Sequence, residues 1–239
     1  MKKAGNAEPQ GANGARDEVV RVVDKLAGID PAAWNALVDA QASATPFMRH
    51  EYLLALQASG SAAPTTGWHL QCLVLGDAAR PRAAALLYLK DHSYGEYVFD
   101  WAWADAYQRH GLPYYPKLLG AVPFTPVPGP RLLARTQADR LVLLLAMQAF
   151  ARQATLSSAH LLFIDDADRA AVTAVSDAGW MLRSTVQFHW TQRRPEPWTD
   201  FADFLAGLQR DKRKKIQQER RRVADAGDRK STRLNSSHG

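Results

Sequence analysis

The residues best suited to chemistry are concentrated in one stretch, 88–133, which reads YLKDHSYGEYVFDWAWADAYQRHGLPYYPKLLGAVPFTPVPGPRLL. Its ionisable side chains at even spacing are Lys90, His92, Glu96 and Asp100. A strand or hairpin through them would place these side chains on related faces. Because buried charges are costly unless they are paired or used, a working pocket is one interpretation of the pattern. The alternative is a well-packed aromatic core whose loops are held rigid by proline and glycine.

Several familiar motifs are missing from the chain. It contains no GxSxG, Walker, HExxH, CxxC or GxGxxG motif, and no Arg/Gln-x-x-Gly-x-Gly/Ala turn of the acetyl-CoA-binding kind. Five histidines lack ligand-like spacing, so we expect no metal site: His69, His92, His110, His160 and His189. The nearest equivalent of an anion-binding turn is PVPGPRLLARTQADR, where Arg131 and Arg135 stand before a predicted helix.

A mixed α/β fold must position these residues. The pattern predicts helices over 29–41 (capped by Asp30, with Pro31 at its first position), 45–60, 137–155 and 166–179. It predicts strands over 68–77, 82–92, 95–101, 159–165 and 181–190, with the first two adjacent and antiparallel. In the last strand, Leu182, Val186, Phe188 and Trp190 would share one face. This order of elements indicates a mixed sheet flanked by helices over about 17–200.

Composition and charge set further bounds. The chain has 239 residues, of which 46% are hydrophobic, and a net charge of +6. No run reaches the roughly 20 apolar residues of a membrane helix, and no secretory signal is evident, so we expect a cytoplasmic protein. The single cysteine, Cys72, lies in an apolar run and is predicted to be buried and inert.

The positive charge is concentrated near the end of the chain. The segment RDKRKKIQQERRR, 210–222, carries eight basic and two acidic side chains. Asp200 and the spacing of Phe201, Phe204, Leu205 and Leu208 predict one helix over 200–227. A solvated charged helix is the simplest interpretation of the basic half, and contact with tRNA or anionic lipid is the alternative.

Four runs carry a resemblance to a known family. They are PFMRHEYLLALQASGS, YLKDHSYGEYVFDWAWADAY, GLPYYPKLLGAVPFTPVPGPRLL and VQFHW. Together they resemble the FemAB-like subgroup of the GNAT acyltransferase superfamily, associated with peptidoglycan biosynthesis or recognition in bacteria. The resemblance runs from about 29 to 227. It implies the first of two tandem GNAT-like domains, with 201–227 as a basic helix leading to a second domain absent from this chain.

The resemblance also implies an activity. Fem-type proteins transfer an amino acid from aminoacyl-tRNA to a lipid-linked peptidoglycan precursor, whereas GNAT enzymes use acyl-CoA. We therefore expect an acyl donor of one of these kinds, an amine acceptor and no permanently bound cofactor. A non-catalytic module that binds a cell-wall precursor, tRNA or a protein partner is the alternative. Without its second domain, the chain is expected to be inactive.

Candidate roles follow from acyl transfer, in which groups are positioned, an oxyanion is stabilised and a proton is removed. The catalytic candidates are His92, Glu96 and Tyr94. The substrate-binding candidates are Lys90, Asp100, Tyr114, Tyr115, Lys117, Arg131 and His189.

The two ends of the chain differ from the rest. Residues 1–16 are small and polar and are predicted to be disordered. The ending DRKSTRLNSSHG, 228–239, has no apolar period. Its codons can be written as a common synthetic sequencing adapter, so we interpret it as an assembly artefact.

Overall fold

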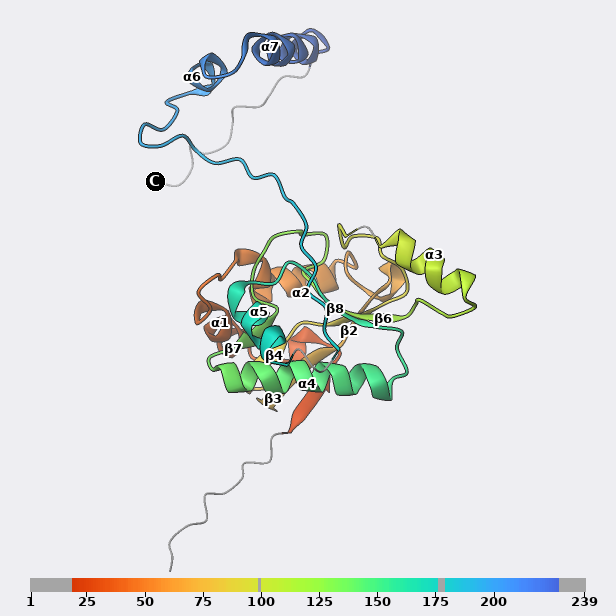
Figure 1. Ribbon diagram of the computed structural model, residues 1–239. Helices are drawn as coiled ribbons and strands as arrows, with labels where there is room; N and C mark the ends of the chain where they lie inside the picture. The colour runs from red at the N-terminus through yellow and green to blue at the C-terminus, as the bar shows by residue number, and fades with distance from the viewer. Residues whose placement is uncertain (1–18, 99, 176–178, 228–239) are drawn as a thin grey trace, which may run out of the picture. The chain divides into compact units, whose positions relative to one another are not determined.

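The computed structural model describes residues 19–98, 100–175 and 179–227. The predictions for 1–16 and 228–239 lie outside these residues. The chain divides into two compact units, Met1–Met181 and Leu182–Gly239, which are considered separately below. Figure 1 labels their helices and strands.

The described residues of the first unit form two four-stranded sheets. One has the order β1 (Val20–Val23), β3 (Cys72–Asp77), β4 (Arg80–Ala85) and β7 (Leu132–Ala134). The other has the order β2 (Trp68–Leu70), β5 (Tyr88–Lys90), β6 (Lys117–Gly120) and β8 (Ala159–Leu161). All pairs are antiparallel except β6 and β8. The α/β class is thus confirmed, with the strands divided between two sheets.

One bent hairpin joins the two sheets. Only Gln71 separates β2 from β3, and only Leu86 and Leu87 separate β4 from β5. The Gln71 N–H donates to the Leu87 carbonyl at 2.8 Å, so the pairing continues across the bend. The predicted antiparallel neighbours 68–77 and 82–92 are therefore confirmed.

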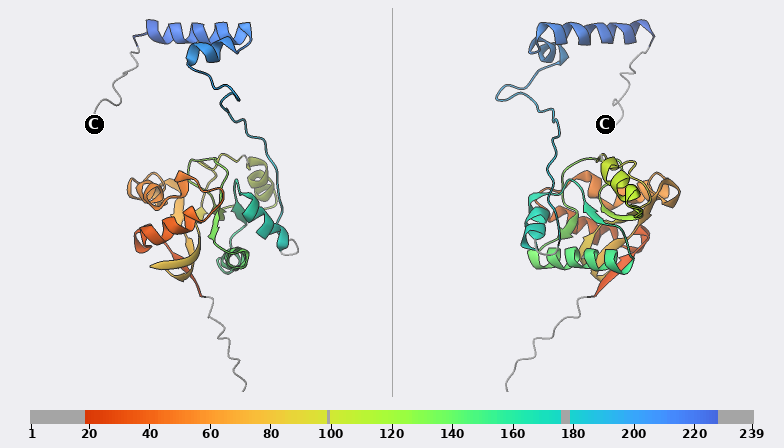
Figure 2. Two further views of the ribbon diagram at one scale, coloured as in Figure 1. Left: turned by 90° about the vertical axis from the view of Figure 1, so that its left-hand side faces the viewer. Right: turned by 45° about the vertical axis from the view of Figure 1, so that its right-hand side comes forward.

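Helices cover both faces of the sheets (Figures 1 and 2). The helices α1 (Pro31–Asp39) and α2 (His50–Ala58) pack on one face, whereas α4 (Gln137–Gln153) and α5 (Asp166–Ala174) pack on the other. Alternation along β3 divides its side chains between two cores: Cys72 and Val74 join the first, and Leu73 and Leu75 the second. The 3₁₀ turns Leu26–Gly28, Pro46–Met48 and Pro64–Thr66 complete the α1–α2 side.

Capping chemistry explains two of the predicted helices. The Asp30 side chain accepts the Ala33 N–H at 2.7 Å, and Pro31 occupies the first helical position of α1. Thr136 caps α4 in the same manner, by accepting the Asp139 N–H at 3.1 Å. Both helices begin where the sequence predicts.

A proline-rich excursion separates β6 from β7. Both strands pair with the same edge of the bent hairpin, and 121–131 leaves the sheet between them. Arg131 fixes its end, because the fully buried guanidinium donates to the carbonyls of Val127, Pro130 and Leu162. The Asp168 carboxylate accepts hydrogen bonds from the backbone N–H groups of Arg131, at 2.6 Å, and of Leu132, at 3.2 Å.

Two predicted strands are wrong. The described residues of 95–101 form a turn followed by α3 (Trp101–Arg109), because Gly95 and Tyr97 have φ of 81° and 58°, which no strand accommodates. The described segment 181–190 also forms no strand, and Phe188 is 99% exposed. Alternation makes a segment competent to pair, but strand hydrogen bonds need a partner edge, and none pairs with it among the described residues.

The described residues of the second unit form two helices, where the sequence predicts one. The helix α6 (Phe201–Ala206) ends at Gly207, and α7 (Arg210–Asp225) begins after Gln209, whose ψ of 146° is extended. Asp200 caps α6 as predicted, accepting the Asp203 N–H at 2.8 Å. No side chain of α7 is buried. None of the helices in the described part of the chain is long and apolar enough to cross a membrane.

Candidate functional site

A row of side chains crosses one face of the second sheet. Trp68 pairs with Lys90, and Lys90 pairs with Lys117, so the three lie side by side on β2, β5 and β6. Cross-strand partners project from the same face. Here that face is the one covered by α1 and α2, because Tyr88 and Leu119 belong to that core. The sheet register thus places two lysines next to each other in a buried position.

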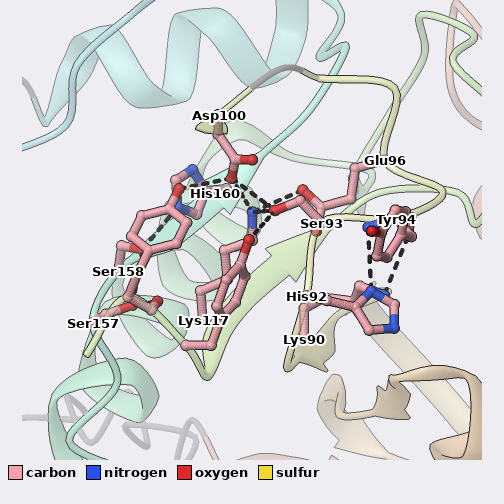
Figure 3. Close-up of polar contacts among 12 residues, drawn as sticks. Lys90, His92, Ser93, Tyr94, Glu96, Asp100, Lys117, Ser157, Ser158 and His160 are labelled. Carbon is pink, nitrogen blue, oxygen red and sulfur yellow. Dashed lines mark hydrogen bonds and ion pairs between the residues drawn. The ribbon is translucent and has the colours of Figure 1, made fainter. Parts of the chain in front are cut away.

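Lys117 is the centre of the polar cluster shown in Figure 3. Its ammonium donates to Ser93 Oγ at 2.9 Å, Glu96 Oε2 at 2.8 Å and Asp100 Oδ2 at 2.5 Å. Glu96 and Asp100 come from the turn after β5 and the start of α3, and they are 3% and 5% exposed. All three donors of the ammonium are therefore used, two of them in buried ion pairs.

Two tyrosines close the cluster on one side. The Tyr114 hydroxyl donates to Asp100 Oδ2 at 2.8 Å, and the Tyr115 hydroxyl shares a 2.7 Å hydrogen bond with Ser93 Oγ. The two rings meet edge to face with centroids 4.9 Å apart. Ser93 thus has hydrogen bonds with Asp100, Tyr115 and Lys117. Asp100 has hydrogen bonds with Ser93, Tyr114 and Lys117.

The two carboxyls of the cluster differ in electrostatics. Burial would raise the pKa of Asp100, but hydrogen bonds from Lys117, Tyr114 and Ser93 bring it below its usual value. Burial raises the pKa of Glu96 above its usual value, although Lys117 opposes this. Asp100 is therefore the more firmly ionised of the two, and Glu96 accepts a proton more readily.

Lys90 lies beside this cluster but has poorer partners. Its ammonium lies 3.8 Å from the centroid of the Trp68 ring and donates to the Tyr94 carbonyl at 3.4 Å. The side chain is fully buried. Burial lowers its pKa to about 8, whereas Glu96 and Asp91 oppose the shift.

An open hollow of about 640 Å³ adjoins the cluster. It lies between α3 and the segment 111–115, and its lining includes Trp101, Gln108, Leu112, Tyr114 and Tyr115. No residue of α3 is buried, and Trp101 is 52% exposed. The two tyrosines therefore form a boundary between the hollow and the buried charges.

The carboxylates keep unused hydrogen-bonding capacity. Glu96 Oε1 and Asp100 Oδ1 are buried and have no hydrogen-bond partner among the described residues. Unpaired buried acceptors are rare in folded proteins and call for an explanation such as a bound water, a ligand or a catalytic role. A ligand in the hollow reaches these oxygens only if the tyrosine boundary rearranges.

A serine–histidine pair lies on the other side of Tyr114. Ser158 Oγ and His160 Nε2 are 2.8 Å apart, and Ser157 Oγ donates to the Tyr114 carbonyl. His160 pairs with Leu119 across β6 and β8, and its ring centroid is 6.5 Å from that of Tyr114. Ser157 and His160 thus support the position of Tyr114.

The structure gathers some of the candidate residues into one place. Those in or beside the cluster are Lys90, Glu96, Asp100, Tyr114, Tyr115 and Lys117. These six residues do not line one shared concavity, because the charged groups are buried and only the two tyrosines line the hollow.

Four other candidates lie apart from the cluster. The His92 ring faces Asp91 and accepts the Tyr94 N–H, and the Tyr94 ring is 67% exposed. The Arg131 guanidinium donates to the carbonyls of Val127, Pro130 and Leu162, and its contact with a substrate anion stays a prediction. His189 is exposed and belongs to the second unit.

Sequence reasoning did not select Ser93, Trp68 or Ser158. Ser93 lies within the selected stretch, but a lone serine gives no signal of its own. Trp68 opens a strand and looks like ordinary core, and only the register reveals that it underlies Lys90. Within the described residues, no group of three or more His, Cys, Asp or Glu could hold a metal ion.

These features define an α/β protein with a sealed ion cluster beside an aromatic hollow. The chain belongs to the FemAB-like family, described as peptidoglycan biosynthesis/recognition, whose model matches residues 25–236. No curated protein and no solved structure matches this chain.

Proposed function

We propose that the protein is an N-acyltransferase or aminoacyltransferase of the Fem type. It would move an acyl group from aminoacyl-tRNA or acyl-CoA to an amine, with a peptidoglycan precursor as the acceptor. The family match supports the peptidoglycan context. The observation that carries the proposal is the contact between the hollow and the Lys117 cluster through Tyr114 and Tyr115. Both donors are made in the cytoplasm, where the reaction would take place.

The cluster supplies the electrostatics that acyl transfer requires. As the amine attacks the carbonyl, negative charge develops on the carbonyl oxygen, and the nitrogen must lose a proton. Lys117 is a fixed cation, and Tyr115 is linked through Ser93 to both Lys117 and Asp100. The hollow is therefore lined by a tyrosine whose hydroxyl is already part of a charged network.

The alternative is recognition of a cell-wall precursor, tRNA or a protein partner without chemistry. One observation favours it: Glu96 Oε1, Asp100 Oδ1 and the Lys90 side chain are closed to solvent. A sealed ion cluster that only shapes the hollow would give binding and no turnover.

The test compares binding and turnover with matched variants. Acetyl-CoA, alanyl-tRNA and a lysine-containing muropeptide serve as probes, with binding measured by saturation-transfer NMR and transfer by mass spectrometry. Turnover is measured on this chain and on a longer family member with the same cluster, because the family resemblance implies a second domain. Tyr115→Phe removes the hydroxyl at the boundary, and Tyr97→Phe, at an exposed position, is the control.

We expect an acylated product that falls at least about tenfold in Tyr115→Phe and is unchanged in Tyr97→Phe. Binding without any product would favour the recognition alternative. Absence of both, in folded protein, would refute the transferase proposal.

The second unit offers a surface for an anionic partner. The helix α7 carries the eight basic side chains of 210–222, all outside any core. In this proposal it contacts the tRNA donor or anionic lipid. Retention of tRNA that is lost at high salt would identify tRNA, whereas flotation with anionic vesicles would identify lipid.

A further inference from the structure

The two neighbouring lysines of the site have opposite surroundings. Lys117 uses all three donors, on Ser93, Glu96 and Asp100. Lys90 makes one long hydrogen bond, to the Tyr94 carbonyl, and otherwise lies on the Trp68 ring. Both side chains are almost fully buried, so solvent does not compensate for the difference.

This difference decides which lysine holds a charge. A buried ammonium whose donors lack acceptors loses hydration that attraction to the Trp68 ring replaces only in part, whereas a neutral amine packs on the ring at little cost. Lys117 gains two carboxylates and therefore stays charged. Lys90 faces Glu96 and Asp91, which favour its charge, and Lys117, which disfavours it; burial outweighs them and lowers its pKa to about 8. The two lysines therefore differ in their partners, and of the two only Lys90 lacks a carboxylate partner within hydrogen-bond distance among the described residues.

We propose that Lys90 is the proton acceptor of the site and that Lys117 is its permanently charged neighbour. This assignment rests on the proposed transferase function. It gives a role to Lys90, which makes none of the hydrogen bonds that hold Ser93, Glu96 and Asp100 together. The neutral amine of Lys90 has the lone pair that a base requires, and Arg or a fully paired Lys lacks one.

The step balances as follows. The acceptor nitrogen forms a bond to the acyl carbon, and its surplus proton passes to Lys90 Nζ, which becomes an ammonium. The bond from the acyl carbon to the donor oxygen or sulfur then breaks, and that atom leaves with the electron pair. The Lys90 ammonium returns the proton to the leaving oxygen or sulfur and regenerates the neutral amine.

Access to Lys90 depends on the turn above it. The Tyr94 carbonyl covers Nζ, and its 3.4 Å distance marks a weak hydrogen bond. The turn contains Gly95 in the left-handed region, at φ 81°. A substrate amine would take the place of this carbonyl, which requires the turn to move.

The test is a direct titration of the lysines in the whole chain. Lysine labelled with ¹³C at Cε is followed by NMR from about pH 6 to 12, and Lys90→Arg identifies the Lys90 signal by its loss. We expect Lys90 to titrate near pH 8. Glu96→Gln removes an attractive charge and should lower the Lys90 midpoint further.

The same variants are then assayed for transfer. Lys90→Arg keeps the positive charge but cannot accept a proton. Lys90→Met keeps the packing on Trp68 but has neither a charge nor a proton-accepting group. The transfer rate of both variants should fall at least about a hundredfold. Lys25→Arg is the control. A Lys90 midpoint at or above pH 10, or undiminished transfer in Lys90→Met, would overturn the assignment while leaving the transferase proposal intact. Absence of transfer by the longer wild-type family member with the same cluster would count against the proposed function and would not depend on the titration.

Discussion

Replacing Lys117 by Met would remove the cation that holds two buried carboxylates. Met has a similar length and no charge, so the substitution tests electrostatics more than packing. Glu96 and Asp100 would remain 3% and 5% exposed without their shared partner. Removing one partner of a buried ion pair costs about 3–5 kcal/mol, because the remaining charge is left uncompensated. We expect a loss of this size in the free energy of unfolding at about pH 7.

The pH dependence gives the prediction its sign. In the wild type, hydrogen bonds from Lys117, Tyr114 and Ser93 overcome burial and hold the pKa of Asp100 below its usual value. Asp100 thus contributes stability above its unfolded pKa, and this stability is lost as the pH falls through the folded pKa. In Lys117→Met, burial prevails and the folded pKa of Asp100 rises above the unfolded value. Asp100 then contributes stability at low pH, and this contribution is lost as the pH rises. The free energy of unfolding of the variant therefore lies closer to that of the wild type at about pH 4 than at about pH 7.

The assay is urea unfolding at both pH values, followed by the fluorescence of the tryptophans. Trp34 and Trp68 are fully buried in the first unit and report its unfolding. Lys25→Met, at an exposed position, is the control. The double variant Lys117→Met/Glu96→Gln removes one orphaned charge and should be more stable than Lys117→Met alone. A deficit below about 1 kcal/mol, or one that does not change with pH, would refute the account of the cluster.

Three further predictions concern the surroundings of the site. Gly95→Ala should lower the free energy of unfolding by more than about 2 kcal/mol, since its Cβ would lie 2.6 Å from the Phe124 ring at a φ of 81°. Gly111→Ala, with a φ of 68° and open space around the new Cβ, should cost only about 1 kcal/mol in the same denaturation assay. Equal losses in the two variants would contradict this prediction. Asp168→Asn places an amide against backbone N–H donors at 2.6 and 3.2 Å and should cost about 2–4 kcal/mol; a melting temperature unchanged from that of the wild type would show that the loop does not depend on this carboxylate. Limited trypsin digestion should leave a resistant fragment that ends at Arg183, just after the first compact unit; a fragment of the first unit that ends within α4 or α5 by mass spectrometry would disprove it.

Local rules account for much of what the sequence predicts. Asp30, Pro31 and Thr136 place helix starts by capping chemistry, which depends only on nearby residues. Alternation and turn residues predict the antiparallel runs 68–77 and 82–92. The density of charges and aromatics in 88–133 points to the stretch that forms most of the cluster.

Long-range pairing decides the rest. Alternation at 181–190 could not say whether an edge is available to pair with, and left-handed backbone at Gly95 and Tyr97 replaces the strand predicted there. Even spacing grouped His92 with Glu96, yet in the folded turn the His92 ring faces Asp91. The Arg131 guanidinium donates to backbone carbonyls such as that of Val127.

The different roles of Lys90 and Lys117 follow from tertiary structure alone. The sequence supplies two lysines 27 positions apart with nothing to distinguish them. The sheet register sets them side by side, and the turn and α3 deliver both carboxylates to Lys117. Lys90 receives a tryptophan ring and one weak carbonyl contact. The charge of a buried group depends on the atoms around it, and only the folded chain determines which atoms those are.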